Sequence, residues 1–264
     1  MIRGEFVLIS VVSGSGGTGK SVVCACISAH LEKQGKKTMV VDTNGVFSDL
    51  DIYLGVEGEV TYNISDVLTK KCDLTDALLK VCEDKELYFL PSSRHNDVLD
   101  FDAADLIDIL NELKNTFDCV IVDCDNNKNL IKTIMSVSDM AIVISFQDLL
   151  SVRNSDNLIS IIEDNDIDIK LLINKYSNEK NASYYLMSAD DMLDKLGINL
   201  IGIIPECDEL KKATNSSVFS LLESETVLDC VFENISKRIL GATVPITKFD
   251  KKEKTLKIRF FNKH

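Results

Sequence analysis

Eight consecutive residues near the N-terminus have the types and the spacing needed to surround a charged group. The run reads Gly14, Ser15, Gly16, Gly17, Thr18, Gly19, Lys20 and Ser21. It fits the pattern G-x-x-x-x-G-K-[ST] at every position, and an apolar run precedes it. Glycines lack Cβ atoms, so several backbone N–H groups can converge on one anion, and the start of a following helix adds its positive dipole end. The run therefore predicts a phosphate-binding loop.

The last two residues of the loop suggest which phosphate compound is bound. Lys20 is predicted to reach the β- and γ-phosphates of ATP, and the Ser21 hydroxyl to ligate Mg²⁺. The run also fits G-x-G-x-x-G, so a dinucleotide loop and a glycine-rich turn without a ligand are the alternatives. A dinucleotide loop has no use for Lys-Ser after its last glycine, so we favour a mononucleotide.

Two acidic residues follow apolar runs and are candidates for the same site. Asp123 ends the run Val120-Ile121-Val122, where a carboxylate can hold Mg²⁺ through water at the carboxyl edge of a sheet. Asp42 ends the run Thr38–Val41 in the same way. Taken alone the pattern is weak, because strands often end in Asp as a turn or cap residue. We predict Asp123 as a metal ligand, and Asp42 and Lys20 as catalytic residues.

Apolar runs of strand length alternate with amphipathic stretches along the chain. The runs are rich in Val and Ile and do not alternate with polar residues, as expected of strands buried on both faces. This order predicts an α/β fold, a doubly wound and mostly parallel sheet with helices on both faces. The expected strands are 6–12, 38–41, 87–90, 119–122, 141–145, 170–173 and 200–204. The expected helices are 20–34, 102–115, 151–164, 183–196 and 225–240, with Ser224 as the cap of the last.

Composition and charge restrict the class of protein. The 264 residues carry a net charge of −13, which disfavours nucleic acid as a partner. The eight cysteines form no C-x-x-C pair and fall mostly in apolar runs, so we interpret them as buried thiols in a reducing compartment. No signal peptide or run of membrane-spanning length is present, and we predict a cytoplasmic protein.

The last residues differ in charge from the rest of the chain. The segment 248–264 holds seven Lys and Arg residues against two acidic residues, together with large apolar side chains. We divide the chain into an ATPase domain, 1–241, and a basic-hydrophobic tail, 242–264. The tail is interpreted as a reversible membrane anchor. A solvated tail or an extra edge strand is nearly as well supported, because apolar and basic residues alternate at 256–260.

Several segments in the same order resemble the MinD/ParA family of P-loop ATPases, and most closely its MinD members. They cover essentially the full length. The segments are 13–21, 41–51, 87–91, 118–124, 151–156, 172–175, 200–205 and 238–241, followed by the basic tail. The resemblance implies a homodimer formed with ATP, a protein partner that stimulates hydrolysis or is positioned as cargo, and binding to a surface. It also implies that Asn174 and the loop from Pro205 hold the adenine.

Three positions depart from the family pattern. Ser15 stands where the family has a lysine that reaches across the dimer to the partner's phosphates. Asn44 replaces the second carboxylate of an Asp-x-Asp, which is associated with the attacking water. The sequence 124–127, Cys-Asp-Asn-Asn, replaces a mobile Pro-Ala-Gly switch. Because these changes remove a cation and a carboxylate that phosphoryl transfer uses, we expect ATP binding with slow hydrolysis.

The implied function is a nucleotide-controlled switch in spatial positioning, at the cell division site or a similar location, with the protein cytoplasmic and peripheral on the membrane. Two alternatives remain open. One is a degenerate ATP-binding scaffold that localises pilus or flagellar machinery, which the departures favour. The other is a ParA-like partitioning ATPase, which the acidic body disfavours.

Overall fold

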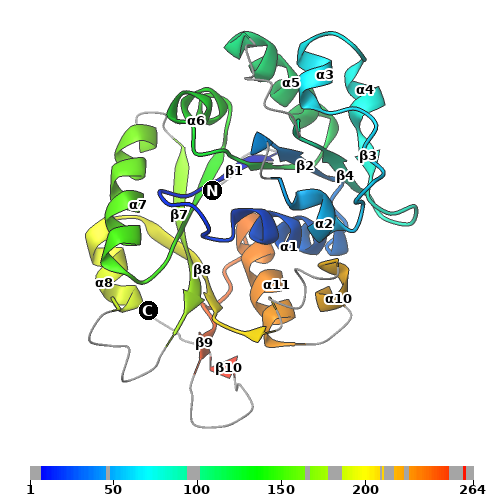
Figure 1. Cartoon of the computed structure of the whole chain (residues 1–264). Helices are drawn as coiled ribbons and strands as arrows, with labels where there is room; N and C mark the ends of the chain where they lie inside the picture. The colour runs from blue at the N-terminus through cyan, green and yellow to red at the C-terminus, as the bar shows by residue number, and fades with distance from the viewer. Residues whose placement is uncertain are drawn as a thin grey trace.

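An eight-stranded sheet with helices on both faces forms the body of the molecule (Figure 1). The computed structural model describes residues 7–45, 48–93, 102–163, 167–177, 186–208, 210, 217–222, 226–249 and 258–259. The strand order is β3-β4-β2-β5-β1-β6-β7-β8. Within the sheet, β3 is antiparallel to β4 and all other neighbouring pairs are parallel. The prediction of a doubly wound, mostly parallel sheet is confirmed.

The strands occur where the apolar runs predicted them. They are β1 (Val7–Val12), β2 (Thr38–Asp42), β4 (Leu87–Leu90), β5 (Cys119–Asp123), β6 (Met140–Ser145), β7 (Asp168–Tyr176) and β8 (Asn199–Pro205). Every residue of the central strands β1, β5 and β6 is buried, which explains their unbroken apolar sequences. The sequence did not predict β3 (Leu79–Lys80), because two half-exposed residues carry no pattern.

The helices pack in two layers that leave the carboxyl edge of the sheet accessible. One layer contains α1 (Lys20–Lys33), α2 (Leu50–Leu54), α10 (Phe219–Leu222) and α11 (Val227–Ile239). The other contains α5 (Ala103–Thr116), α6 (Lys128–Met135), α7 (Leu149–Ile162) and α8 (Ala189–Leu196). Two short helices, α3 (Ile64–Leu68) and α4 (Leu74–Ala77), pack against each other between β2 and β3.

Side-chain caps move several predicted helix boundaries. Asp148 accepts a hydrogen bond from the Ser151 backbone, so α7 begins at Leu149. Ser188 caps α8, which begins at Ala189 and not at the expected residue 183. The cap of α11 is Thr226, which accepts from the backbone N–H of Asp229. The predicted cap, Ser224, lies outside the described residues.

Part of the predicted tail packs on the body. The Arg238 guanidinium donates to the backbone carbonyls of Ile201, Val244 and Pro245, and the Asn234 amide lies 3.5 Å from the buried Thr247 hydroxyl. Beyond this point β9 (Lys248–Phe249) pairs antiparallel with β10 (Ile258–Arg259). The other residues of the proposed anchor, 250–257 and 260–264, lie outside the described residues.

The thiols are less uniformly buried than expected. Cys24, Cys26, Cys119 and Cys124 are buried, whereas Cys82 is exposed. Burial raises the pKa of Cys119 to about 12. Within the described ranges, no helix is both long and apolar enough to cross a membrane.

Candidate functional site

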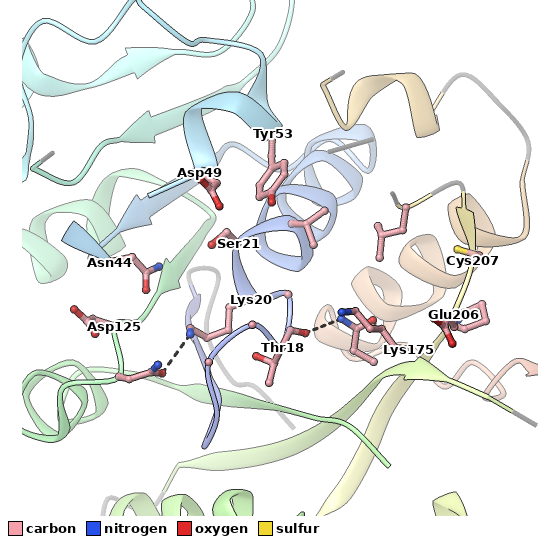
Figure 2. A pocket seen from close by; sticks show the side chains of 18 residues that line it. Thr18, Lys20, Ser21, Asn44, Asp49, Tyr53, Asp125, Lys175, Glu206 and Cys207 are labelled. Atoms are coloured by element: carbon pink, nitrogen blue, oxygen red, sulfur yellow. Dashed lines mark hydrogen bonds between the residues drawn. The ribbon is translucent and has the colours of Figure 1, made fainter. Parts of the chain in front are cut away.

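The loop Gly14–Ser21 connects β1 to α1 at the carboxyl edge of the sheet and borders a cavity of about 740 Å³ (Figure 2). Figure 2 shows Lys20, Asn44 and Asp125 at one end of the cavity, and Lys175, Glu206 and Cys207 at the other. The cavity is lined by Gly16, Gly17, Thr18, Gly19, Lys20, Ser21, Val22, Asn44, Asp49, Tyr53, Asp125, Asn126, Asn174, Lys175, Pro205, Glu206, Cys207 and Leu210. Six of the eight predicted loop residues therefore face one space.

Gly19 must be glycine for two reasons. Its φ of 87° lies in the left-handed region, and a Cβ there would lie 2.7 Å from Nδ2 of Asn174. That amide donates a buried 2.7 Å hydrogen bond to the carbonyl oxygen of Thr18. The contact fixes the loop to the end of β7, so Asn174 both lines the cavity and supports the loop.

The first two residues of the loop contact α7. A Cβ on Gly14 would lie 2.3 Å from the backbone carbonyl carbon and oxygen of Asn154. The Asn154 amide donates a 3.0 Å hydrogen bond to the Ser15 hydroxyl. Neither Gly14 nor Ser15 is among the residues that line the cavity, so their predicted part in phosphate binding stays a prediction.

Lys20 extends along the cavity wall at the end that also holds Asn44 and Asp125. Its Nζ atom lies 3.4 Å from Oγ of Ser13 and 3.3 Å from Oδ1 of Asn126, the second contact drawn as a dashed line in Figure 2. Both hydrogen-bond partners are neutral, and the nearby Asp123 carboxylate is the charged group that interacts with this ammonium. Lys20 therefore brings a positive charge to the cavity, and its predicted roles in phosphate binding and catalysis stay predictions.

Asp123 is a completely buried carboxylate directly behind the loop. Neither of its oxygens has a hydrogen-bond partner in normal geometry among the described residues. Burial raises the pKa of Asp123, and the nearby Ser21 hydroxyl and Asn44 amide oppose that rise. A buried carboxylate without a partner is costly, and a cation removes that cost. This observation fits the predicted role of Asp123 and Ser21 at a Mg²⁺ site.

Asp42 pairs in register with Asp123 on the neighbouring strand but is held differently. Its oxygens accept hydrogen bonds from the backbone N–H of Asn44 and from the Ser48 hydroxyl. Burial, with the adjacent Asp123 charge, raises the pKa of Asp42 to about 7. Asp42 is fully buried and is not one of the cavity-lining residues, so its catalytic role stays a prediction.

The two residues predicted to hold the adenine both line the cavity. Asn174 lies near the end of β7 and Pro205 ends β8, and their contact with adenine stays a prediction. Lys175 has a φ of 50°, which turns the chain after Asn174. The Asn174 side chain, which donates to Thr18, also accepts through Oδ1 a 2.8 Å hydrogen bond from the backbone N–H of Lys175.

The sequence reasoning gave no individual role to several lining residues: Val22, Asp49, Tyr53, Asp125, Asn126, Lys175, Glu206, Cys207 and Leu210. Of these, Asp125 and Asn126 lie in the segment that replaces the family's switch, and Glu206 and Cys207 lie in the loop expected to hold the adenine. Glu206 directly follows β8 and Asn126 lies three positions beyond the end of β5, and position after a parallel strand was a usable signal for them. Tyr53 and Leu210 come from segments whose approach to the loop depends on tertiary packing.

The parallel sheet and the strand–loop–helix unit at its centre define a P-loop NTPase fold. Comparison with known proteins agrees. The model of the CobQ/CobB/MinD/ParA nucleotide binding domain matches residues 9–220, and the chain belongs to this family.

Curated relatives cover nearly the whole chain. The septum site-determining protein MinD of Bacillus subtilis is 30% identical over 259 residues, covering 96% of this chain and 97% of the relative. MinD of Helicobacter pylori is also 30% identical, over 93% of this chain and 95% of its own length. The solved MinC:MinD cell division protein complex of Aquifex aeolicus matches with a TM-score of 0.83 and 28% identity, over 92% of this chain and 98% of that one. The resemblance to MinD/ParA proteins is confirmed.

Proposed function

We propose that the chain binds ATP with Mg²⁺ and acts as a MinD-like, nucleotide-controlled dimeric switch in spatial positioning, with slow hydrolysis. The observation that carries the proposal is the unpartnered, buried Asp123 carboxylate behind an intact phosphate loop. A bound cation would satisfy this carboxylate, and a nucleotide phosphate would satisfy Lys20 beside it. The solved MinD of Pyrococcus horikoshii, complexed with Mg-ADP, shares the fold at 22% identity.

Each end of the cavity has a proposed role. Backbone N–H groups of the loop and Lys20 bind the phosphates, while Ser21 and Asp123 hold Mg²⁺, with Asp123 acting through water. Mg²⁺ supplies neutralisation of the charge that develops on the transferred phosphoryl group. Asn174 and Pro205 bind the adenine at the opposite end.

Slow hydrolysis is proposed from two neutral side chains at the phosphate end. Ser15 bonds to Asn154 and carries no charge with which to reach a partner subunit. The Asn44 amide cannot take a proton from an attacking water as a carboxylate can. Asp42 accepts a hydrogen bond from the Asn44 backbone N–H, and we propose it as the residual catalytic acid or base.

A dimer formed with ATP and a protein partner are proposed from the relatives. The Aquifex aeolicus MinC:MinD complex shows that a similar chain binds another protein. For this chain we propose a partner that either stimulates hydrolysis or is positioned as cargo. The protein is placed in the cytoplasm, peripheral on the inner face of the membrane through residues 248–264.

A second candidate is a degenerate ATP-binding scaffold that localises other machinery. The neutral residues Ser15 and Asn44 favour it, because such a scaffold needs binding without turnover. A ParA-like partitioning ATPase is a weaker candidate, since the net charge of −13 opposes contact with nucleic acid.

Nucleotide binding is tested with Lys20→Ala. We expect isothermal titration calorimetry with Mg²⁺ to show ATP binding to the natural chain and none to Lys20→Ala at the same concentrations. Lys195→Ala, at an exposed position in α8, is the matched control and should bind ATP as the natural chain does. Binding by Lys20→Ala as tight as that of the natural chain would remove the basis of the proposal.

The switch chemistry is tested with Ser15→Lys combined with Asn44→Asp. Restoring both charged groups should raise the steady-state ATPase rate, because a transition-state cation alone is worth about 10³–10⁵ in rate in related systems. If the natural chain already hydrolyses ATP as fast as a relative with both groups, the proposed slow hydrolysis is wrong.

Dimerisation and membrane binding need separate measurements. Mass photometry with a non-hydrolysable ATP analogue should show a dimer, and a strict monomer at high concentration would contradict the switch.

Co-sedimentation with anionic liposomes should show ATP-dependent binding that is lost when the chain ends at Thr247. This truncation keeps the contacts of Arg238 and Asn234. Equal binding by both chains, or none by either, would exclude the anchor.

A further inference from the structure

Asn126 lies in the segment 124–127, which departs from the family's switch pattern, and no role has been assigned to its side chain. It lies between β5 and α6, lines the cavity and is exposed. Its Oδ1 accepts a 3.3 Å hydrogen bond from Nζ of Lys20. Its side chain therefore reaches the phosphate-binding ammonium without any ligand present.

The neighbouring Asn127 shows by contrast what a purely structural asparagine does here. Its Oδ1 accepts from the backbone N–H groups of Asn129 and Leu130, at 2.9 and 3.2 Å, and so caps α6. Because Asn127 performs this task, the start of α6 does not need the Asn126 side chain. Asn126 instead points toward the loop.

The geometry lets Asn126 and a phosphate bind Lys20 together. An ammonium has three donors, so Lys20 can keep Oδ1 of Asn126 and still donate to phosphate oxygens. A phosphate oxygen on the same ammonium lies beside the Asn126 amide, whose Nδ2 atom is bonded to the same carbon as Oδ1. Nδ2 is then available to donate to that oxygen.

Position along the cavity identifies which phosphate this is. Lys20, Asn44 and Asp125 lie at one end, opposite Lys175, Glu206 and Cys207 at the proposed base end (Figure 2). A triphosphate that starts at the base end places its last phosphate nearest this group. The Asn44 amide lies at the same end, where it is close enough to the Asp123 carboxylate to lower that group's pKa.

We propose that Asn126 binds the γ-phosphate of ATP through Nδ2 while its Oδ1 remains on Lys20, and so distinguishes ATP from ADP. The inference rests on the proposed function, since it requires ATP in this cavity. It adds to the terminal phosphate a side-chain contact from a residue that differs from the family pattern. A neutral amide suits this role, because a carboxylate would repel the phosphate.

The test compares the affinity for a non-hydrolysable ATP analogue with the affinity for ADP, both with Mg²⁺, by titration calorimetry. In Asn126→Ala the affinity for the analogue should fall about 10- to 100-fold, which corresponds to one hydrogen bond to a charged group. The affinity for ADP should change less than about threefold. In Asn126→Asp, which has a side chain of the same shape, the affinity for the analogue should fall at least as much.

Asn127→Ala is the matched control. It removes the cap of α6 and should lower thermal stability, but it should leave the ratio of the two affinities unchanged. An unchanged ratio in Asn126→Ala overturns the inference. Tighter binding of both nucleotides in that variant also overturns it, because it would show that Asn126 only competes with phosphate for Lys20. If the natural chain binds neither nucleotide, the proposed function fails as well, and this outcome is distinct from the other two.

Discussion

Replacing Gly14 by alanine tests how closely the loop packs on α7. The added Cβ would lie 2.3 Å from the carbonyl carbon and oxygen of Asn154 and 2.7 Å from the backbone nitrogen of Ser155. Ordinary van der Waals contact begins at 3.4 Å, so the overlap is about 1 Å. All three atoms belong to the backbone of a helix, and no flexible side chain can move aside.

The magnitude follows from the cost of overpacking a close-packed interior. Relieving the overlap requires movement of the loop or of α7, and such insertions cost about 1–3 kcal/mol. For a domain of this size, 1 kcal/mol lowers Tm by about 2–4 °C. We therefore expect Gly14→Ala to lower Tm by about 2–12 °C. Because the movement also disturbs the hydrogen bond between Asn154 and Ser15, nucleotide binding should weaken too.

Gly16→Ala is the matched control, two residues along the same loop. A Cβ there meets no atom within 4 Å, and the backbone is not in the left-handed region. Its unfolding free energy should therefore stay within about 0.5 kcal/mol of the natural chain. Gly16 lines the cavity, however, and its new methyl group should weaken nucleotide binding.

Differential scanning calorimetry without nucleotide and titration calorimetry with the ATP analogue separate the two effects. The expected pattern is lost stability in Gly14→Ala and lost binding with normal stability in Gly16→Ala. Equal Tm values for Gly14→Ala and the natural chain would refute the close packing of the loop on α7. Normal binding by Gly16→Ala would refute the assignment of this cavity to phosphate.

Three further predictions concern contacts away from the phosphate. Burial lowers the pKa of His30, so its protonation costs more in the folded chain than in the unfolded one, and stability should fall as the pH drops below about 6.5. Between pH 7.5 and 5.5 the Tm of His30→Gln should therefore fall less than the Tm of the natural chain, and an equal fall in both would contradict this. Arg238→Leu leaves three backbone carbonyls without their donor and should cost about 1–3 kcal/mol in urea unfolding, an effect absent in the exposed control Arg153→Leu. Asn174→Ala leaves the buried carbonyl of Thr18 without its partner, so both Tm and ATP affinity should fall; a change in affinity alone would show that Asn174 only contacts the base.

The parts of the fold that the sequence predicted are those with a strong local signal. The central strands are fully buried, so their unbroken Val and Ile runs could be recognised without tertiary information. The loop carries its own motif, and Asp123 was identified because it ends the apolar run of one of these strands. The existence of α1 and α11 was clear from the sequence, whereas their boundaries depended on caps such as Thr226.

The rest depends on contacts between distant segments. The sequence cannot show that Asn154 bonds to Ser15, because 139 positions separate them and neither residue type is unusual. Nor can it show that Asn126 contacts Lys20 while Asn127 caps α6, since two adjacent asparagines look equivalent in one dimension. The strand β3 was missed because its two residues have no apolar pattern of their own.

The Arg238 contacts have a mechanical consequence. If the C-terminal residues hold the protein to a surface, any pulling force enters the body at Thr247. The hydrogen bonds from Arg238 to Val244 and Pro245 would bear part of that force before it reaches the end of α11. The hydrogen bond from Arg238 to Ile201 would transmit it to β8. Since β8 is an edge strand, paired on one side only within the described sheet, it is the strand that a sufficient load would peel away first. The same strand ends at Pro205 in the cavity, so tension on the tail and occupancy of the cavity would act on one element.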